Sequence, residues 1–358
     1  MILNSNIKKT YIIAEAGVNH NGKYEIAKKL IKSAALCKAN AIKFQIFSAS
    51  DLATPKAKMA KYQKKNIKKK LSQQDMLKKL ELKKNDYLNL KKYAKKNNID
   101  FMVSVFDEKS LDFYEKKIKN KLLKIPSGEI TNYFLLRKLD YIKYKIILST
   151  GMSNLEEIMD ALNIIAKSKI YDLKKNKIRI RDKKKHFSFK KKVFLLHCVS
   201  DYPVSKKFLN LNCINTLIKN FQLITGFSDH STSLFTSSIS VAAGAKIIEK
   251  HFTLNRKMLG PDHSSSLNPI QLKKFIQNIR ETELILGSDE KKVQPCEVSN
   301  MKSVRKSIVA LDTINKNEKF SIKKLTAKRP ANGLSPINIF KILKKKAKKK
   351  FTKNEIIK

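Results

Sequence analysis

The chain has few of the residues that mark several large classes of protein. Nine Gly and eight Pro in 358 residues exclude a collagen-like repeat, and a hydrophobic content of 42% excludes a chain too polar to fold. Its four cysteines are scattered and include no CxxC pair, so we expect reduced thiols in a cytoplasmic protein rather than a disulfide framework. They are Cys37, Cys198, Cys213 and Cys296.

Long apolar runs are also missing. The longest uncharged stretch, residues 231–245, is diluted with Ser and Thr. It is shorter than the roughly 18 apolar residues that suggest a membrane-spanning helix. Residues 1–17 do not show a basic region, an apolar stretch and a small-residue cleavage site in series, so we expect neither a secretory signal nor a membrane association.

Acidic residues are scarce: 30 Asp and Glu stand against 77 Lys and Arg, a formal net charge of +47. Taken alone, this excess suggests a polyanion-binding protein. Only seven of the basic residues are Arg, however, and base readout depends on the planar guanidinium fork that Lys lacks. We interpret the Lys excess as a solvated surface with no specific nucleic-acid site. A Lys-rich polyanion-binding protein with a degenerate barrel is the alternative from another class.

Short apolar runs alternate with amphipathic segments, which is the pattern of βα units. The runs expected to form strands are residues 11–17, 41–47, 100–106, 122–127, 145–150, 193–199, 222–227 and 246–252. Eight such units in roughly 285 residues predict an α/β fold, a (β/α)8 TIM barrel over residues 1–286. A doubly wound open sheet is the alternative, although no GxGxxG motif follows the first strand.

Three segments fall outside this pattern. Residues 168–192 are polar and basic and interrupt the rhythm between the fifth and sixth units, so we predict a surface loop or a short hairpin there. Residues 287–300 form a predicted linker. Residues 301–358 combine short apolar runs with charged turns and predict a small β-rich domain, whose basic tail from residue 339 is expected to end in a helix.

Polar side chains interrupt the predicted strands at their C-terminal ends, where barrel enzymes carry their active sites. Lys43 and Gln45 are two residues apart and point to the same side of a strand, as do Glu249 and His251. A charged side chain in an apolar strand is costly unless it is paired or ligand-bound. One such residue can be a satisfied core pair, but the series indicates a site. Its members are Glu15, Lys43, Gln45, Lys124, Ser127, Glu129, Ser149, Ser200, Tyr202, Ser228, His230, Glu249 and His251.

The residue types suggest an anion site beside a metal site. Two ammonium groups, Lys43 and Lys124, together with serine hydroxyls form a plausible phosphate cradle. His230 and His251 end neighbouring predicted strands and could share a divalent cation. Two protein nitrogens would leave positions open for water and substrate, which is typical of a catalytic metal.

A set of motifs covers nearly the whole chain in order. They are AEAGVNHNG (14–22), IKFQIF (42–47), KIPSGEITN (124–132), LSTGMSNLEEI (148–158), LLHCVSDYP (195–203), GFSDHS (226–231), EKHFT (249–253) and GPDH (260–263). Together they resemble the N-acetylneuraminate (sialic acid) synthase family. AKRPANGLSP (327–336) resembles the signature of that family's C-terminal antifreeze-like (SAF) domain. Residues 56–66 and 72–82 look more like the neuraminate/legionaminate branch than the pseudaminate one.

The resemblance implies a transferase that condenses phosphoenolpyruvate with an N-acylated hexose, N-acetylmannosamine in the type reaction, and releases phosphate. A synthase of legionaminate or of a spore-coat sugar, with the same mechanism, is the alternative. The resemblance also implies that His230 and His251 bind Mn2+, or Mg2+ or Co2+ in its place. Phosphoenolpyruvate would be held by Lys43, Lys124, Ser127, Ser149, Ser200 and Ser228.

The remaining site residues are also implied by the resemblance. Those expected to meet the sugar or the reacting centre are Glu15, Gln45, Glu129, Tyr202 and Asp262, of which Glu15 and Glu129 are catalytic with the two histidines. Arg329, from the SAF domain, would reach the N-acyl group of the sugar in the partner subunit of a domain-swapped homodimer. Ser200 departs from the pattern, because relatives often have Asn there.

Overall fold

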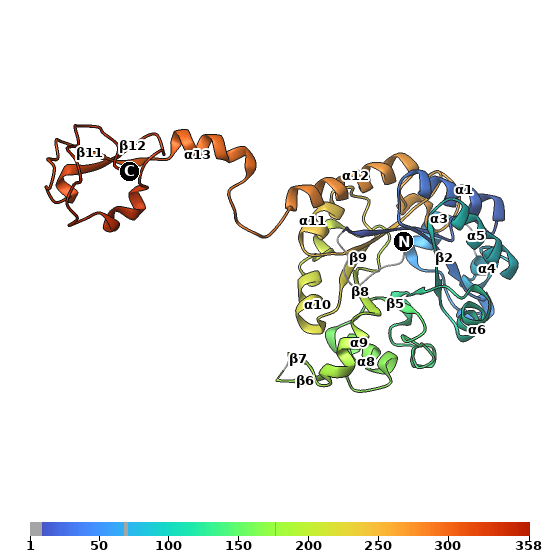
Figure 1. The fold of residues 1–358 in the computed structure, drawn as a ribbon. Coiled ribbons are helices and arrows are strands. Elements are labelled where there is room, and N and C mark those ends of the chain that lie inside the picture. The colour runs from blue at the N-terminus through green and yellow to red at the C-terminus, as the bar shows by residue number, and fades with distance from the viewer. Residues whose placement is uncertain (1–8, 68–70, 176) are drawn as a thin grey trace. The chain divides into compact units, whose positions relative to one another are not determined.

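The computed structural model describes residues 9–67, 71–175 and 177–358. The chain divides into two compact units, Met1–Gly287 and Ser288–Lys358. Within the described residues of the first unit, eight parallel strands close a barrel in the order β1-β10-β9-β8-β5-β4-β3-β2 (Figure 1). Their bounds are β1 Tyr11–Gly17, β2 Ala41–Ile46, β3 Asp100–Val105, β4 Leu122–Ile125, β5 Lys145–Ser149, β8 Val193–Cys198, β9 Thr225–Asp229 and β10 Ile247–His251.

The closed sheet confirms the predicted barrel and excludes the open doubly wound sheet, because β1 pairs in parallel with both β10 and β2. The seventh strand is displaced from its predicted place at residues 222–227. Gln222 ends the preceding helix in a left-handed conformation (φ 50°), so the strand begins only at Thr225. Ser228 therefore lies within β9 rather than after it.

Helices surround the barrel and bury one face against it (Figure 1). In α1, the buried side chains Ala27, Leu30, Ile31 and Ala34 recur at the three- and four-residue spacing of one helix face. The helices between and after the barrel strands are α1 Tyr24–Leu36, α2 Ala49–Leu52, α3 Lys61–Ile67, α4 Gln73–Lys78, α5 Lys84–Lys96, α6 Glu108–Phe113, α7 Tyr133–Leu136, α8 Leu155–Ala166, α9 Lys183–Phe189, α10 Cys213–Phe221, α11 Thr236–Ala242 and α12 Pro269–Leu286.

The inside of the barrel is apolar at the N-terminal ends of its strands. A cluster of inward side chains fills this end, and its largest members are Tyr11, Met102, Phe194 and Leu196. These side chains close the barrel below the level at which the charged residues begin. The charged residues therefore lie toward the C-terminal ends of the strands, the end at which barrel enzymes carry their active sites.

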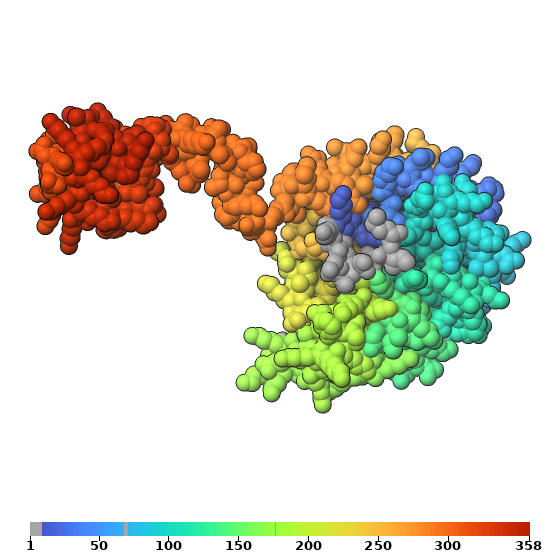
Figure 2. All heavy atoms as spheres, viewed as in Figure 1, coloured from blue at the N-terminus to red at the C-terminus, as the bar shows by residue number. Residues whose placement is uncertain are grey.

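The irregular segment at 168–192 is a hairpin followed by a short helix, which confirms the predicted hairpin. Strands β6 (Tyr171–Lys174) and β7 (Lys177–Ile180) pair antiparallel, and α9 follows them. In Figure 2 this yellow-green segment protrudes from the edge of the barrel unit. Within the described residues, none of the helices combines the length and apolar character that crossing a membrane requires.

The second unit has its own small core of side chains that include Ile308, Phe320 and Phe351. Its elements are α13 Val298–Val304, β11 Ser307–Ala310, β12 Leu325–Lys328 and a 3-10 helix at Pro336–Lys341. The prediction of a helix at the end of the basic tail is wrong. The tail is extended there, with β-bridges from Phe351 to Ile314 and from Ile356 to Val309, because its few apolar residues must reach this core.

Candidate active site

Four charged side chains from four strands meet inside the barrel, and we call them the Lys–Glu cluster: Glu15, Lys43, Lys124 and Glu249. Lys43 Nζ lies 2.9 Å from Glu15 Oε2 and 3.6 Å from Glu249 Oε2. Lys124 Nζ lies 3.1 Å from Glu249 Oε1. None of the four is more than 4% exposed. The structure thus brings together, as predicted, strand-end charges that lie more than 200 residues apart in sequence.

The two carboxyl groups of this cluster differ in how readily they bind a proton. Burial raises the pKa of Glu249, but the charges of Lys124 and Lys43 outweigh it and bring this pKa down to about 2. For Glu15, burial outweighs the effect of Lys43, and the negative charge of Glu249 adds to it, so its pKa is raised. Glu249 is therefore the stronger acid of the two carboxyl groups, and Glu15 is the weaker.

Serine side chains lie beside the lysines. Ser228 Oγ donates to Glu249 Oε1 at 2.9 Å, and Ser127 Oγ accepts from the backbone N of Gly151 at 3.0 Å. Ser149 Oγ is buried and has no hydrogen-bond partner among the described residues, which leaves a donor for a ligand. A Cβ on Gly151 would approach Ser200 Oγ to 2.3 Å and Ser127 Oγ to 2.8 Å. Glycine at 151 therefore lets these hydroxyls converge.

His230 and His251 lie side by side, with ring centroids 5.4 Å apart. His230 Nδ1 donates to the carbonyl of Val199 at 2.8 Å, and its Nε2 lies 3.4 Å from Ser228 Oγ. Burial lowers the pKa of His230, but Cys198 and the carbonyl of Val199 outweigh it, so the net shift is upward and a metal ion would take the place of the Nε2 proton. Burial, followed by the charges of His230 and Lys43, holds the pKa of His251 well below its usual range, so its imidazole is neutral. Its buried Nδ1 has no hydrogen-bond partner within the described part of the chain.

These two imidazoles fit a divalent transition-metal ion, for which neutral histidine is a common ligand. In residues 9–67, 71–175 and 177–358, no group of three or more His, Cys, Asp or Glu side chains is placed to bind a metal. The protein would therefore offer two nitrogen ligands and leave the other coordination positions to water and substrate.

Aromatic rings form a wall beside the histidines. The ring of Tyr202 lies 4.1 Å from that of His230 and 5.5 Å from that of His251, centroid to centroid. The ring of Tyr62 also packs on Tyr202, with centroids 4.9 Å apart. Tyr62 belongs to α3, in the long connection after β2, and our sequence analysis did not identify it. Asp262 is buried, and burial, together with the charge of Glu15, raises its pKa to about 7.

Two further predicted residues belong to the barrel unit, and a third belongs to the second unit. Gln45 Nε2 donates to Glu15 Oε1 at 3.2 Å, so Gln45 adjoins the Lys–Glu cluster. Glu129 lies in a 3-10 turn directly after β4, where its Oε2 accepts from Asn132 at 2.7 Å. Arg329 belongs to the second unit, where its Nε donates to the carbonyl of Val304 at 2.9 Å.

Cys198 is a site residue that sequence analysis missed. It is buried at the end of β8, with Sγ 3.7 Å from His230 Nδ1. Burial raises the pKa of this thiol, but His230 and the neighbouring Ser127 and Lys124 lower it more, so the net shift is downward. The signal was available: Cys198 lies at the C-terminal end of a predicted strand, two residues before Ser200.

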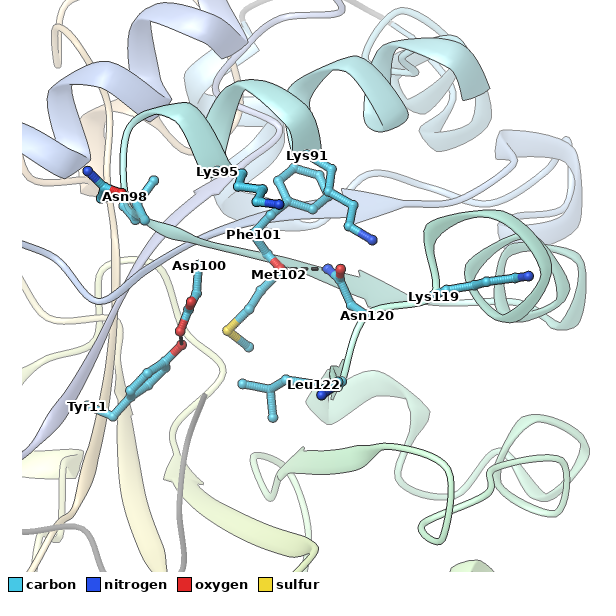
Figure 3. Close-up of a pocket in the computed structure, with 12 residues that line it drawn as sticks. Tyr11, Lys91, Lys95, Asn98, Asp100, Phe101, Met102, Lys119, Asn120 and Leu122 are labelled. Atoms are coloured by element: carbon cyan, nitrogen blue, oxygen red, sulfur yellow. Dashed lines mark hydrogen bonds between the residues drawn. The ribbon is translucent and has the colours of Figure 1, made fainter. Parts of the chain in front are cut away.

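A separate hollow of about 660 Å³ lies at the opposite end of the barrel (Figure 3). It is lined by the first residues of β1, β3 and β4 and by lysines of α5 and the loop before β4. Its polar groups serve the fold: Tyr11 Oη donates to Asp100 at 2.7 Å, and Asn120 Nδ2 donates to the carbonyl of Phe101 at 2.6 Å. The described residues that line it include no histidine, cysteine or serine.

Comparison with protein families matches residues 30–291 to the NeuB family. The chain belongs to the NeuB family. The match covers most of the barrel unit and confirms the expected relationship to sialic acid synthases. The NeuB chain is 43% identical to an N,N'-diacetyllegionaminic acid synthase of Campylobacter jejuni, over 98% of this chain and 99% of that protein. It is 30% identical to the N-acetylneuraminate-9-phosphate synthase of Homo sapiens, over 94% of this chain and 88% of that one.

A solved structure shares the NeuB fold. It is a crystal structure of the N-acetylneuraminic acid synthetase of Leptospira borgpetersenii in complex with citrate. The similarity has a TM-score of 0.67 at 32% identity, and it covers 82% of this chain and 90% of that chain. This NeuB chain is thus an enzyme that belongs to the nonulosonic acid synthases.

Proposed function

We propose that this chain condenses phosphoenolpyruvate with a hexose bearing two acetamido groups, giving a legionaminic acid and phosphate. The observation that carries this proposal is the 43% identity to a diacetyllegionaminic acid synthase, against 30% to a neuraminate-9-phosphate synthase. The relatives therefore favour the legionaminate alternative over N-acetylmannosamine, the sugar expected from the type reaction.

The Lys–Glu cluster supports the binding of phosphoenolpyruvate. Lys43 and Lys124 are buried cations in a water-poor site, where a charge-assisted hydrogen bond to phosphate or carboxylate is strong. Ser127, Ser149, Ser200 and Ser228 supply short hydroxyl donors around them. We assign phosphoenolpyruvate, a trianion, to this pocket. The Ser149 hydroxyl, which has no partner among the described residues, would donate a hydrogen bond to it.

A Mn2+ ion, or Mg2+ or Co2+ in its place, would be held by His230 and His251. When bound, such an ion supplies Lewis-acid polarisation of the aldehyde oxygen of the open-chain sugar. In the proposed reaction, C3 of phosphoenolpyruvate forms a bond to the aldehyde carbon, whose oxygen takes up a proton. Water adds to the cationic C2 and loses a proton, and the C2–O bond to phosphate breaks as the remaining C2 hydroxyl loses its proton to give the keto acid. Glu15 lies where a carboxylate can stabilise the positive charge at C2.

Proton transfer falls to carboxyl groups with raised pKa values. Asp262, with a pKa of about 7, can either give or accept a proton at neutral pH. The pKa of Glu129 is also raised, chiefly by burial. We assign Asp262, Glu129, Gln45 and Tyr202 to the sugar side of the site. We further propose that Arg329 of an SAF domain binds the sugar's N-acyl group across a homodimer.

The substrate proposal is tested with a panel of sugars. The purified enzyme is incubated with phosphoenolpyruvate, Mn2+ and either N-acetylmannosamine, its 6-phosphate or 2,4-diacetamido-2,4,6-trideoxymannose. We expect kcat/KM, measured by phosphate release, to be highest with the diacetamido sugar and mass spectrometry to show its nonulosonate product. A higher value with N-acetylmannosamine would return the assignment to neuraminate synthesis.

Replacing Lys43 or Lys124 with Met should weaken phosphoenolpyruvate binding selectively. Loss of a charged hydrogen bond costs about 1.5–3 kcal/mol, so the KM for phosphoenolpyruvate should rise about 10- to 100-fold. The KM for the sugar should change much less. Because Lys124→Met leaves Glu249 buried without its cation, the double variant Lys124→Met/Glu249→Gln serves as the charge-balanced control. Equal losses for both substrates would contradict the assignment.

The Lys-rich surface should be dispensable for the reaction. Lys174, Lys177 and Lys184 are exposed residues of the 168–192 segment. Changing all three to Glu should leave turnover within a few-fold of wild type, since screened surface charges act weakly on a buried site. Heparin affinity should fall. A collapse of turnover in a folded triple variant would instead support the polyanion-binding alternative for this surface.

A further inference from the structure

A second buried ion pair lies just outside the barrel wall, directly behind the histidines. Lys250 Nζ and Asp229 Oδ2 are 2.8 Å apart, and both side chains are 0% exposed. Asp229 and Lys250 are also partners in the parallel pairing of β9 with β10. Because side chains alternate along a strand, Asp229 and Lys250 point away from the barrel interior, while His230 and His251 point into it.

The pair holds the backbone on the far side of His230. Asp229 Oδ1 accepts from the backbone N of Ser231 at 2.8 Å, and Lys250 Nζ donates to the backbone carbonyl of the same residue. Asp229 Oδ2 also accepts from Thr236 Oγ1 at the start of α11. Asp229 and Ser231, which flank His230, thus both contact Lys250, which precedes His251.

Removing both charges from water is costly, so the net contribution of the pair to stability is small compared with the cost of removing one partner alone. A buried ion pair often contributes no more than well-packed apolar side chains of the same size would. The pair forms hydrogen bonds to both the backbone N–H and the backbone carbonyl of Ser231, however. Apolar side chains cannot form these bonds. The strand-pairing register ends at Asp229 and Lys250, so beyond this point the ladder no longer fixes the position of His230.

We propose that Asp229 and Lys250 are positioning residues that set the separation and orientation of the His230 and His251 imidazoles. Fixing the backbone around His230 also keeps its Nδ1 directed at the carbonyl of Val199, and so its Nε2 directed into the site. The consequence for metal affinity rests on the proposed function. The consequence for the imidazole hydrogen bond does not.

The first measurement uses the metal-free protein. In imidazole 15N–1H NMR spectra, the Nδ1–H of His230 should be protected from exchange in wild type and should broaden or exchange faster in Lys250→Met and Asp229→Asn. His186 and His197 are internal references, because each bonds to a distant backbone carbonyl, of Phe221 and Leu209. An unchanged His230 signal in both folded variants would overturn the inference.

The second measurement is Mn2+ affinity by electron paramagnetic resonance. Residues that orient metal ligands typically contribute about 10- to 100-fold to affinity, and we expect that loss in Lys250→Met and Asp229→Asn. Tyr11→Phe is the matched control: it removes the hydroxyl that donates to Asp100 at the opposite end of the barrel and should leave Mn2+ affinity unchanged. Equal weakening in the control would show a general effect of destabilisation and overturn the inference.

Failure of the proposed metal site and failure of the inference give different results. If wild type does not bind Mn2+, the proposed metal site is wrong, and the inference is decided by the His230 signal alone. If the charge variants do not fold, Thr236→Val decides it, because this near-isosteric change removes one hydrogen bond to Asp229 and leaves the ion pair in place. It should give a smaller loss of Mn2+ affinity, of a few-fold, and wild-type affinity in this folded variant would count against the inference.

Discussion

Replacing either His230 or His251 with Ala should abolish turnover and metal binding while the protein stays folded. Lewis-acid stabilisation by a bound ion contributes several kcal/mol to the barrier, and each 1.36 kcal/mol is a factor of ten, so kcat should fall at least about 1,000-fold. Both side chains lie at strand ends above the apolar barrel core, so their truncation should cost little stability. The measurements are kcat with saturating Mn2+ and metal content after dialysis.

The matched control for this prediction is His197→Gln. His197 is also a buried strand residue, but its Nε2 bonds to the carbonyl of Leu209 at 2.7 Å, on the helix side of β8. This variant should retain its metal and most of its turnover. Full activity of wild type in excess EDTA would refute the metal requirement. So would wild-type metal content in both alanine variants.

The barrel could be predicted from sequence because its strands are apolar segments of regular spacing, separated by amphipathic helices. The β1 segment was predicted with the bounds it has, since Gly17 ends the apolar run. The seventh strand was placed too early because Leu223 and Ile224 are apolar and directly precede β9. A helix C-terminus with a positive φ at Gln222 occupies that position, and residue type did not reveal it.

The charged part of the site was predictable for a different reason. Lys43, Lys124 and Glu249 interrupt apolar strands, and the cost of burying a charge makes such residues conspicuous. Tyr62 gave no comparable signal, because it belongs to a short helix in a long connection. Its packing on Tyr202, 140 residues away, depends on how that connection folds back.

The ion pair behind the histidines was overlooked although both of its residues lie inside the quoted motifs GFSDHS and EKHFT. The residues of these motifs that were predicted to form the site all point into the barrel: Ser228, His230, Glu249 and His251. The intervening Asp229 and Lys250 face the helices, where a sequence pattern cannot distinguish a solvated charge from a buried one. Only the packing of α11 and α12 over them shows that they are enclosed.

Arg329 is expected to act across a subunit boundary, and mixed dimers test this directly. Within its own unit Arg329 is exposed, and its Nε donates to the carbonyl of Val304. Among the described residues this is its one hydrogen bond, so the terminal guanidinium nitrogens can serve a ligand. A guanidinium offers directed donors that suit the carbonyl oxygen of an amide. Homodimers of Arg329→Ala and of His230→Ala should each be nearly inactive, with losses measured as kcat/KM for the sugar.

Mixing the two inactive variants should restore activity if Arg329 serves the partner's barrel. After dissociation and reassociation, random pairing makes about half of the dimers heterodimeric. Each heterodimer then has one site with an intact His230 from one chain and an intact Arg329 from the other, and one site with neither. Recovery should therefore approach about a quarter of wild-type activity. If Arg329 acted within its own chain, both sites of the heterodimer would lack one essential group, and mixing would restore nothing even when mass spectrometry demonstrates exchange.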